Sequence, residues 1–313
     1  MYDCLSAGLL PNEASNFQSA EVLLGLTPSL LTTLAPSIGE ISLVSTRRRG
    51  LALLLAVANP SIYVSRLLSF NDPRQYLQSD DTTTAIPDAL LKLDGRWASV
   101  ASALQYLLAA GAIVNVVHLS WELGFRTVIA WKCNTSYVPF LWTIMPLIVH
   151  LVAAAGWHIS TPVRAINHQQ STKAQAMQCS GLGSKLRQMW TEEFKLPSQC
   201  DQMDVSTIPT GQRQTVSSHD KLAIFLNELA GFGAFLHLLF GTTVFSSLMF
   251  IGVLDALQVI ARYIGSGVVC RIIVNWELAA MRARRPPPAQ QEGIPLQDTG
   301  KFELPDRQTF PMM

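Results

Sequence analysis

Six ionisable or amide side chains stand inside long apolar stretches of this 313-residue chain, and their types are those that do chemistry in membranes. A charged or strongly polar side chain is costly to place in hydrocarbon, so one inside a membrane span is by default a candidate functional residue. The chemistry would be binding of an ion, movement of a proton or recognition of a small solute. The six candidates are Glu40, Asn115, His118, Glu122, His150 and His237.

Asn115, His118 and Glu122 form one group. His118 and Glu122 are four residues apart and Asn115 is three residues before the histidine, so a helix places all three on one face. The group has two interpretations: a site for a cation or a proton, or a polar cap at the membrane interface. In the second interpretation Glu122 pairs with Arg126, which again lies four residues along the chain.

His150 and His237 form a second group on two different apolar runs. Counting from the polar loop between those runs places them about 14 Å and about 12 Å from the same membrane face, so they are predicted to be level. They are either axial haem or metal ligands or a proton relay, or they hydrogen-bond between helices and hold the bundle together. His118 lies near the opposite face, and metal–ligand distances are about 2 Å, so one ion cannot bind both His118 and His150. We assign no metal site and no cofactor.

No catalytic residue is assigned. The sequence contains no nucleophile elbow, phosphate-binding loop, HExxH or paired-carboxylate pattern, so an enzyme is not favoured. Five cysteines are scattered without a CxxC pair, which argues against a zinc ribbon and a redox motif. Cys179 and Cys200 share one loop and either form a disulfide or stay free. A net charge of +1 gives no reason to expect a nucleic-acid partner.

The elements that must position these residues are membrane helices. Charged residues make up 14% of the chain, against about 25% in an average soluble domain, and this deficit indicates the lipid bilayer as a partner. A helix needs about 20 apolar residues to cross a hydrocarbon core about 30 Å thick. Three uncharged runs have this length and are predicted to be spans. They cover residues 98–121, 138–160 and 229–254.

The first apolar run, residues 22–44, is long enough to cross but contains Pro28, Pro36 and Glu40. Residues eight apart lie about 80° apart around a helix, so the two prolines are expected to bend a single span twice in similar directions. Glu40 is then predicted to lie close to the basic residues Arg47 to Arg49 at the membrane rim. A buried ion site in this span is the alternative.

Two further runs are harder to assign. Residues 51–68 contain Asn59-Pro60 in the middle and either cross the membrane or lie in its interface. In residues 256–281 the polar positions recur every four residues and stop at Gly265 to Gly267. This pattern favours two short amphipathic helices at the surface, with one spanning helix as the alternative.

The predicted fold class is all-α: a multi-pass transmembrane helical bundle of about five spans, within a range of four to six. The protein is therefore expected to be integral to a membrane, either the plasma membrane or an endomembrane. The predicted organisation is a polar N-terminal segment (1–20), a membrane region (21–160), a polar loop (161–221), a second membrane region (222–281) and a disordered tail (282–313).

Two orientations fit this organisation. If residues 51–68 cross, the segment TRRRG, the loop after residue 121 and the Arg-rich tail all face the cytosol, as the positive-inside rule prefers for short loops. If residues 51–68 do not cross, the polar loop is cytosolic and residues 256–281 must cross to return the tail to the cytosol. The first arrangement is favoured.

Four phrases occur in order along the membrane regions: EVLLGLTPSLLTTLAPSIGEISL, NVVHLSWELGFRTV, YVPFLWTIMPLIVH and FLHLLFGTTVFSSLMFIGVLDA. Together they resemble a group of uncharacterised fungal multi-pass membrane proteins, with Trp121 where a YELG phrase would have tyrosine. The resemblance implies a membrane protein of fungal type and no catalytic residue. From the Pro- and Gly-broken segments we expect small-solute or ion transport or a channel-like role. The alternative is a non-enzymatic structural or sensory protein that acts through its loops and tail.

Overall fold

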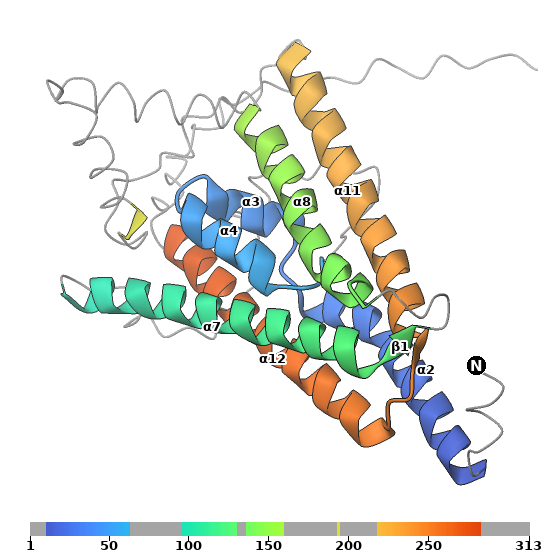
Figure 1. Ribbon diagram of the computed structural model, residues 1–313. Helices are drawn as coiled ribbons and strands as arrows, with labels where there is room; N and C mark the ends of the chain where they lie inside the picture. The colour runs from blue at the N-terminus through green and yellow to red at the C-terminus, as the bar shows by residue number, and fades with distance from the viewer. Residues whose placement is uncertain (1–10, 63–95, 130–135, 160–192, 195–217, 283–313) are drawn as a thin grey trace, which may run out of the picture.

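The computed structural model describes residues 11–62, 96–129, 136–159, 193–194 and 218–282 (Figure 1). Within these ranges the chain forms seven helices and one two-stranded antiparallel sheet. The prediction of an all-α helical bundle is therefore confirmed. The predicted tail beyond residue 282 and most of the polar loop, with Cys179 and Cys200, lie outside the described residues.

Four of the described helices are long and apolar enough to cross a membrane, so the protein is an integral, multi-pass membrane protein. Three of them correspond to the runs predicted to span. The fourth is a single 30-residue helix that continues through Gly265 to Gly267, so the prediction of two short surface helices there is wrong. The four are α7 (Arg96–Arg126), α8 (Val138–Ile159), α11 (Ser218–Phe245) and α12 (Val253–Arg282).

A small sheet fixes the relative directions of these helices. Strand β1 (Val128–Ile129) follows α7, strand β2 (Leu248–Met249) follows α11, and the two strands pair antiparallel. The ends of α7 and α11 therefore meet at one face of the bundle, where α8 and α12 also begin (Figure 1). We call this the strand face. The opposite face, where α7 and α11 begin and α8 and α12 end, is the loop face.

The predicted first span is two helices, α2 (Pro11–Leu34) and α3 (Ile38–Ser45), so the prediction of one kinked helix is wrong. Pro36 has no N–H to continue α2. Ser37 then starts α3 through a capping box: its hydroxyl accepts from the N–H of Glu40, and the Glu40 carboxylate accepts from the N–H of Ser37. The helix therefore stops and restarts within three residues.

Together α2 and α3 pass through the bundle. At the strand face the side-chain oxygen of Asn16 accepts a hydrogen bond from the N–H of Val253, at the start of α12. At the loop face Arg48, just after α3, binds Glu277 near the end of α12. The break between α2 and α3 lies between these two contacts, inside the bundle.

Helix α4 (Arg49–Ala58) has ten residues, about 15 Å, and is too short to cross. It starts at the loop face beside Arg48. After its end, the side-chain oxygen of Asn59 lies 3.9 Å from the position that a Cβ on Gly267 would occupy. Gly267 is half-way along α12, so α4 enters from the loop face and stops at mid-depth. Residues 63–68 of the predicted run lie outside the described residues.

These positions contradict the favoured orientation. The segment TRRRG lies at the loop face, whereas the end of α7 lies at the strand face. The favoured arrangement required both to face the cytosol. The alternative arrangement, in which the last apolar run crosses, agrees with α12. The arginines around α3, α4 and the end of α12 all lie at the loop face, and the positive-inside rule favours the cytosol for such a face.

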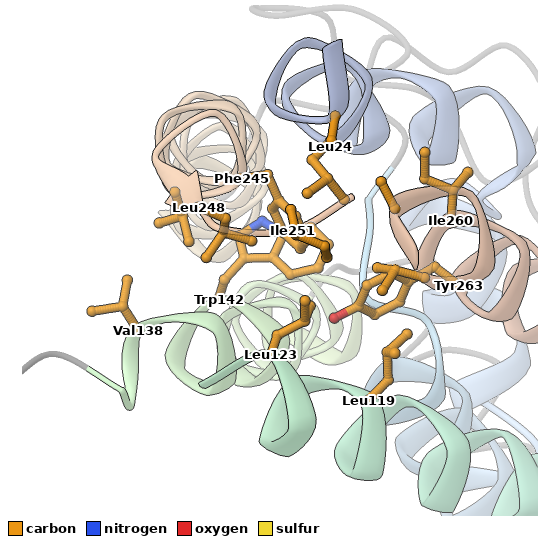
Figure 2. Packing of buried hydrophobic residues seen from close by; sticks show 14 of the residues in the cluster. Leu24, Leu119, Leu123, Val138, Trp142, Phe245, Leu248, Ile251, Ile260 and Tyr263 are labelled. Carbon is orange, nitrogen blue, oxygen red and sulfur yellow. The ribbon is translucent and has the colours of Figure 1, made fainter. Parts of the chain in front are cut away.

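The largest core cluster surrounds Trp142 of α8 in the half of the bundle nearer the strand face (Figure 2). The buried indole meets Phe245 of α11 and Tyr263 of α12 edge to face, with ring centroids 4.8 Å and 5.8 Å apart. The Tyr263 hydroxyl also reaches Ser120 of α7 at 3.1 Å. This cluster fixes α7, α8, α11 and α12 against one another and so supports the residues at mid-depth.

Candidate functional site

The two helix interruptions meet in the middle of the bundle. Ile38, directly after the first break, and Ile62, in the extended residues after α4, pack in one cluster with Val149 and Ala153 of α8. Val149 is 11 residues after the start of α8 and 10 before its end, so this cluster lies at mid-depth. We call Ala35 to Ser37 and Asn59 to Ile62 the two breaks.

Both breaks are buried within the protein. Ala35 is 4% exposed, Asn59 is 2% exposed and Ile62 is 1% exposed. The Ser61 hydroxyl donates to the backbone carbonyl of Pro28 at 3.5 Å, which joins the second break to the last two turns of α2. Irregular backbone at membrane depth is tolerated only where it is buried in protein or lines a water-filled cavity. The two breaks are therefore a packed part of the bundle interior and not the frayed ends of helices.

Proline occupies each break and removes a helical donor. Pro36 stands four residues after Thr32, and Pro60 stands four residues after Ala56. Because proline has no backbone N–H, neither carbonyl receives its i to i+4 hydrogen bond. The two carbonyls are thus among the unsatisfied carbonyls at the ends of α2 and α4, at mid-depth.

Glu40, which was predicted to lie close to Arg47 to Arg49, sits at the first break. Its carboxylate forms an ion pair with Arg271 of α12 at 2.6 Å while it caps the start of α3. The partner of Glu40 is thus an arginine of α12 and lies outside the run 47–49. Glu40 is therefore a fixed, neutralised acid that ties α3 to a long span.

His237 is held by a proline-freed carbonyl on α8. Pro146 lies four residues after Trp142 and leaves the Trp142 carbonyl without a helical donor. His237 Nε2 lies 2.9 Å from this oxygen, and its ring stacks on the Trp142 indole with centroids 5.2 Å apart. The imidazole therefore replaces the missing backbone donor, and Nε2 carries the hydrogen.

His150 is 4% exposed, and neither of its ring nitrogens has a hydrogen-bond partner among the described residues. The packing of Gly241 against Trp142 and of Gly233 against Val149 sets the register of α8 and α11. His237 lies half-way between those two glycines, so His150 is about 7 Å, a little over one helical turn, nearer the loop face. The two imidazoles remain within electrostatic reach of each other.

The predicted group on α7 assembles around an arginine of α12. Arg262 donates to the Glu122 carboxylate at 2.8 Å and to the Asn115 side-chain oxygen at 3.0 Å, and one guanidinium nitrogen lies 3.2 Å from His118 Nδ1. The expected Glu122–Arg126 pair is confirmed at 3.3 Å. Since Arg262 neutralises Glu122, this group fastens α7 to α12 as a cap.

A buried ion pair at the loop face was not predicted. Arg48 and Glu277 are 1% and 0% exposed and lie 2.6 Å apart. The Arg48 guanidinium also donates to Gln105 and Ser102 of α7, each at 2.5 Å. The arginine run 47–49 is visible in the sequence. Arg48 and Glu277 are 229 residues apart, however, so their spacing along the chain did not indicate that they form a pair.

A short part of the polar loop docks beside this pair. The Glu193 carboxylate accepts from the N–H groups of Gly50 and Leu51 at 2.8 Å and 3.2 Å and from the Tyr106 hydroxyl at 2.7 Å. The first turn of α4 is therefore capped by an acid, as the helix dipole favours.

The site offers polar atoms for a small ligand and little for a metal ion of the His, Cys and carboxylate type. In the described ranges no three such side chains come together. Mid-depth instead holds the two breaks, the free carbonyls and the unpartnered His150 imidazole. Searches against protein-family models, curated proteins and solved structures find no match for this chain, so its function is argued from this geometry alone.

Proposed function

We propose that the protein moves an ion or a small solute across its membrane. The observation that carries the proposal is the meeting of two proline-containing helix breaks at mid-depth, buried between long spans. Discontinuous helices that end near the bilayer midplane are how many transporters build a substrate site. A bundle whose only task was anchoring would gain nothing from interrupting its own backbone there.

The charged and polar residues around the breaks support the same proposal. Glu40 holds the first break to α12 through Arg271, and His150 brings an unpartnered imidazole to the level of the mid-depth cluster. Substrate would contact the breaks while the surrounding spans keep their packing around Trp142.

The test is flux through the full-length protein reconstituted in liposomes. Uptake of labelled ions and small neutral solutes would be measured for the wild type and for Glu40→Ala and His237→Ala. Glu40→Ala removes the capping box of α3 and the ion pair with Arg271. His237→Ala removes the hydrogen bond between α11 and the Trp142 carbonyl. Both variants are therefore expected to abolish flux. Asp255→Ala, an exposed acid at the start of α12, is the matched control. Unchanged flux in both test variants would overturn the proposal.

A second function, structural or sensory, is favoured by one observation. Glu193 and Phe194 of the polar loop bind the start of α4 and the Tyr106 ring, so the loop has a defined seat on the membrane bundle. If the loop transmits a signal, deleting residues 161–217 removes function while Glu40→Ala and His237→Ala keep it. The same flux and deletion series separates the two functions.

We also propose, from the four quoted phrases, that the chain belongs with the uncharacterised fungal multi-pass membrane proteins that it resembles. Interrupted phrases such as LLTTLAPSIGEISL coincide with the first break, so relatives should share the break. Finding Pro36 and Pro60 replaced by ordinary helix formers in such proteins would count against the grouping.

A further inference from the structure

We infer that the mid-depth breaks bind a small monovalent cation, Na⁺ or K⁺, through backbone carbonyls. The inference rests on the proposed function for the claim that the bound ion is moved, and it adds the class of the substrate. The hydrogen-bonding groups that remain available at the breaks are mainly acceptors.

The acceptors are available. α2 ends at Leu34 and α4 ends at Ala58, and both helices point their C-terminal ends into the mid-depth region. The last carbonyls of a helix lack intrahelical donors, and this end carries a partial negative charge. The carbonyls of Thr32 and Ala56 belong to these helix ends, and Pro36 and Pro60, four residues further on, have no N–H to donate to them.

Fewer donors are available. The only described helix that begins at the breaks is α3, and two of its first N–H groups are occupied by its own capping box. The N–H of Ser37 donates to the Glu40 carboxylate at 2.6 Å, and the N–H of Glu40 donates to the Ser37 hydroxyl at 3.2 Å. The carbonyls at the ends of α2 and α4 therefore outnumber the N–H groups that α3 leaves free, which favours a cation over an anion at the breaks.

His150 is a second, independent acceptor. Its side chain is 4% exposed, neither ring nitrogen has a partner among the described residues, and it lies next to Val149 in the mid-depth cluster. A neutral imidazole always has one nitrogen with a free lone pair. Carbonyl oxygens with an uncharged ligand suit a singly charged ion, since unwound backbone and helix C-termini coordinate cations of this kind in transporters.

Charge balance agrees with a single positive charge. Glu40, the acid at the first break, is already neutralised by Arg271 of α12 at 2.6 Å. A divalent ion would arrive without a carboxylate to compensate it, and calcium and magnesium prefer carboxylate ligands. Monovalent ions need only the dipoles that the breaks provide.

The test is cation-dependent stabilisation of the full-length protein in nanodiscs, measured as the thermal unfolding midpoint. A ligand that binds only the folded state raises this midpoint in a saturable way. Starting from N-methylglucamine chloride, replacement by NaCl or KCl is expected to raise it, whereas exchanging chloride for gluconate is expected to leave it unchanged. Equal midpoints in all three cations would overturn the inference without any variant.

Variants locate the site. Pro36→Ala and Pro60→Ala return an N–H to each break, so each is expected to weaken the apparent cation affinity on the order of tenfold. His150→Leu is expected to do the same, and His150→Gln, which keeps an acceptor oxygen, is expected to restore binding. Pro139→Ala is the control, because Pro139 stands in the first turn of α8, where no helical donor is needed. Undiminished affinity in all three weakening variants would overturn the location.

The outcomes separate the inference from the proposed function. Cation stabilisation that depends on the prolines, without flux in liposomes, supports the site and overturns transport. Flux of a neutral solute with no cation stabilisation supports transport and overturns the cation site.

Discussion

The bond between His237 and the Trp142 carbonyl predicts a measurable coupling with Pro146. In the native chain Pro146 cannot donate to this carbonyl, and His237 donates instead at 2.9 Å. His237→Ala leaves a buried acceptor unpaired and removes the ring stacked on Trp142. Pro146→Ala supplies a backbone N–H that can take the place of the imidazole. The cost of losing His237 should therefore depend on residue 146.

The magnitude follows from the two interactions that His237 makes. Hydrogen bonds between membrane helices average about 0.6 kcal/mol and reach about 1.7 kcal/mol. Stacking of aromatic rings adds about 0.5–1.5 kcal/mol. His237→Ala is therefore expected to cost about 1–3 kcal/mol in the native background. In the Pro146→Ala background only the stacking part remains, so the coupling energy is expected to be about 0.6–1.7 kcal/mol.

The assay is a double-mutant cycle by SDS-induced unfolding in mixed micelles, followed by circular dichroism. His237→Phe serves as a further variant, since it keeps a ring on Trp142 and loses only the hydrogen bond. It should lose less stability than His237→Ala and should show the same coupling with Pro146→Ala. If His237→Ala costs the same with proline or alanine at position 146, the proposed replacement of the backbone donor is refuted.

Four further substitutions test the rest of the bundle by the same unfolding assay. Glu277→Ala strands the buried Arg48 guanidinium and is expected to cost about 3–5 kcal/mol, whereas Glu122→Ala, at a partly exposed pair, is expected to cost about 1 kcal/mol or less. Equal costs would contradict the role given to burial. Gly241→Ala drives a methyl group against a buried indole and is expected to cost about 1–3 kcal/mol. Gly265→Ala meets nothing within 4 Å and is expected to stabilise α12 by up to about 1 kcal/mol; destabilisation would mean the helix needs a flexible residue there.

Length and charge were enough to predict three of the spans, but not where each one ends. The uncharged run 229–254 was predicted as one helix, yet α11 ends at Phe245. The reason is tertiary: Leu248 pairs with Ile129 of β1, and Phe250 adopts a positive φ of 64° to turn the chain into α12. Nothing in the apolar run distinguishes residues before that turn from residues after it.

Two local patterns in the sequence contain structural information that the sequence-based predictions did not use. Ser37 and Glu40 have the spacing of a capping box directly before an apolar run, which indicates the start of a new helix. The polar positions of residues 256–281 were assigned to a water-facing surface. Instead, Arg262 and Ser266 bond to Asn115 of α7, and this partner stabilises a continuous helix through the glycines. The four-residue spacing of these polar positions correctly indicated one polar face on the helix. It did not indicate whether that face contacts water or another helix.

The prolines of this bundle fall into two groups: Pro146 supports packing between two helices, whereas Pro36 and Pro60 interrupt helices at the proposed ligand site. Pro146 frees a carbonyl that His237 then satisfies, so that proline costs the bundle little and fastens α8 to α11. Pro36 and Pro60 free carbonyls where two helices end together, and at about the same depth lies an imidazole with no partner among the described residues. A buried polar group left unpaired is expensive. Two irregular backbones and an unpaired His150 at the same depth are most simply accounted for if a ligand completes their bonding for part of the protein's working cycle.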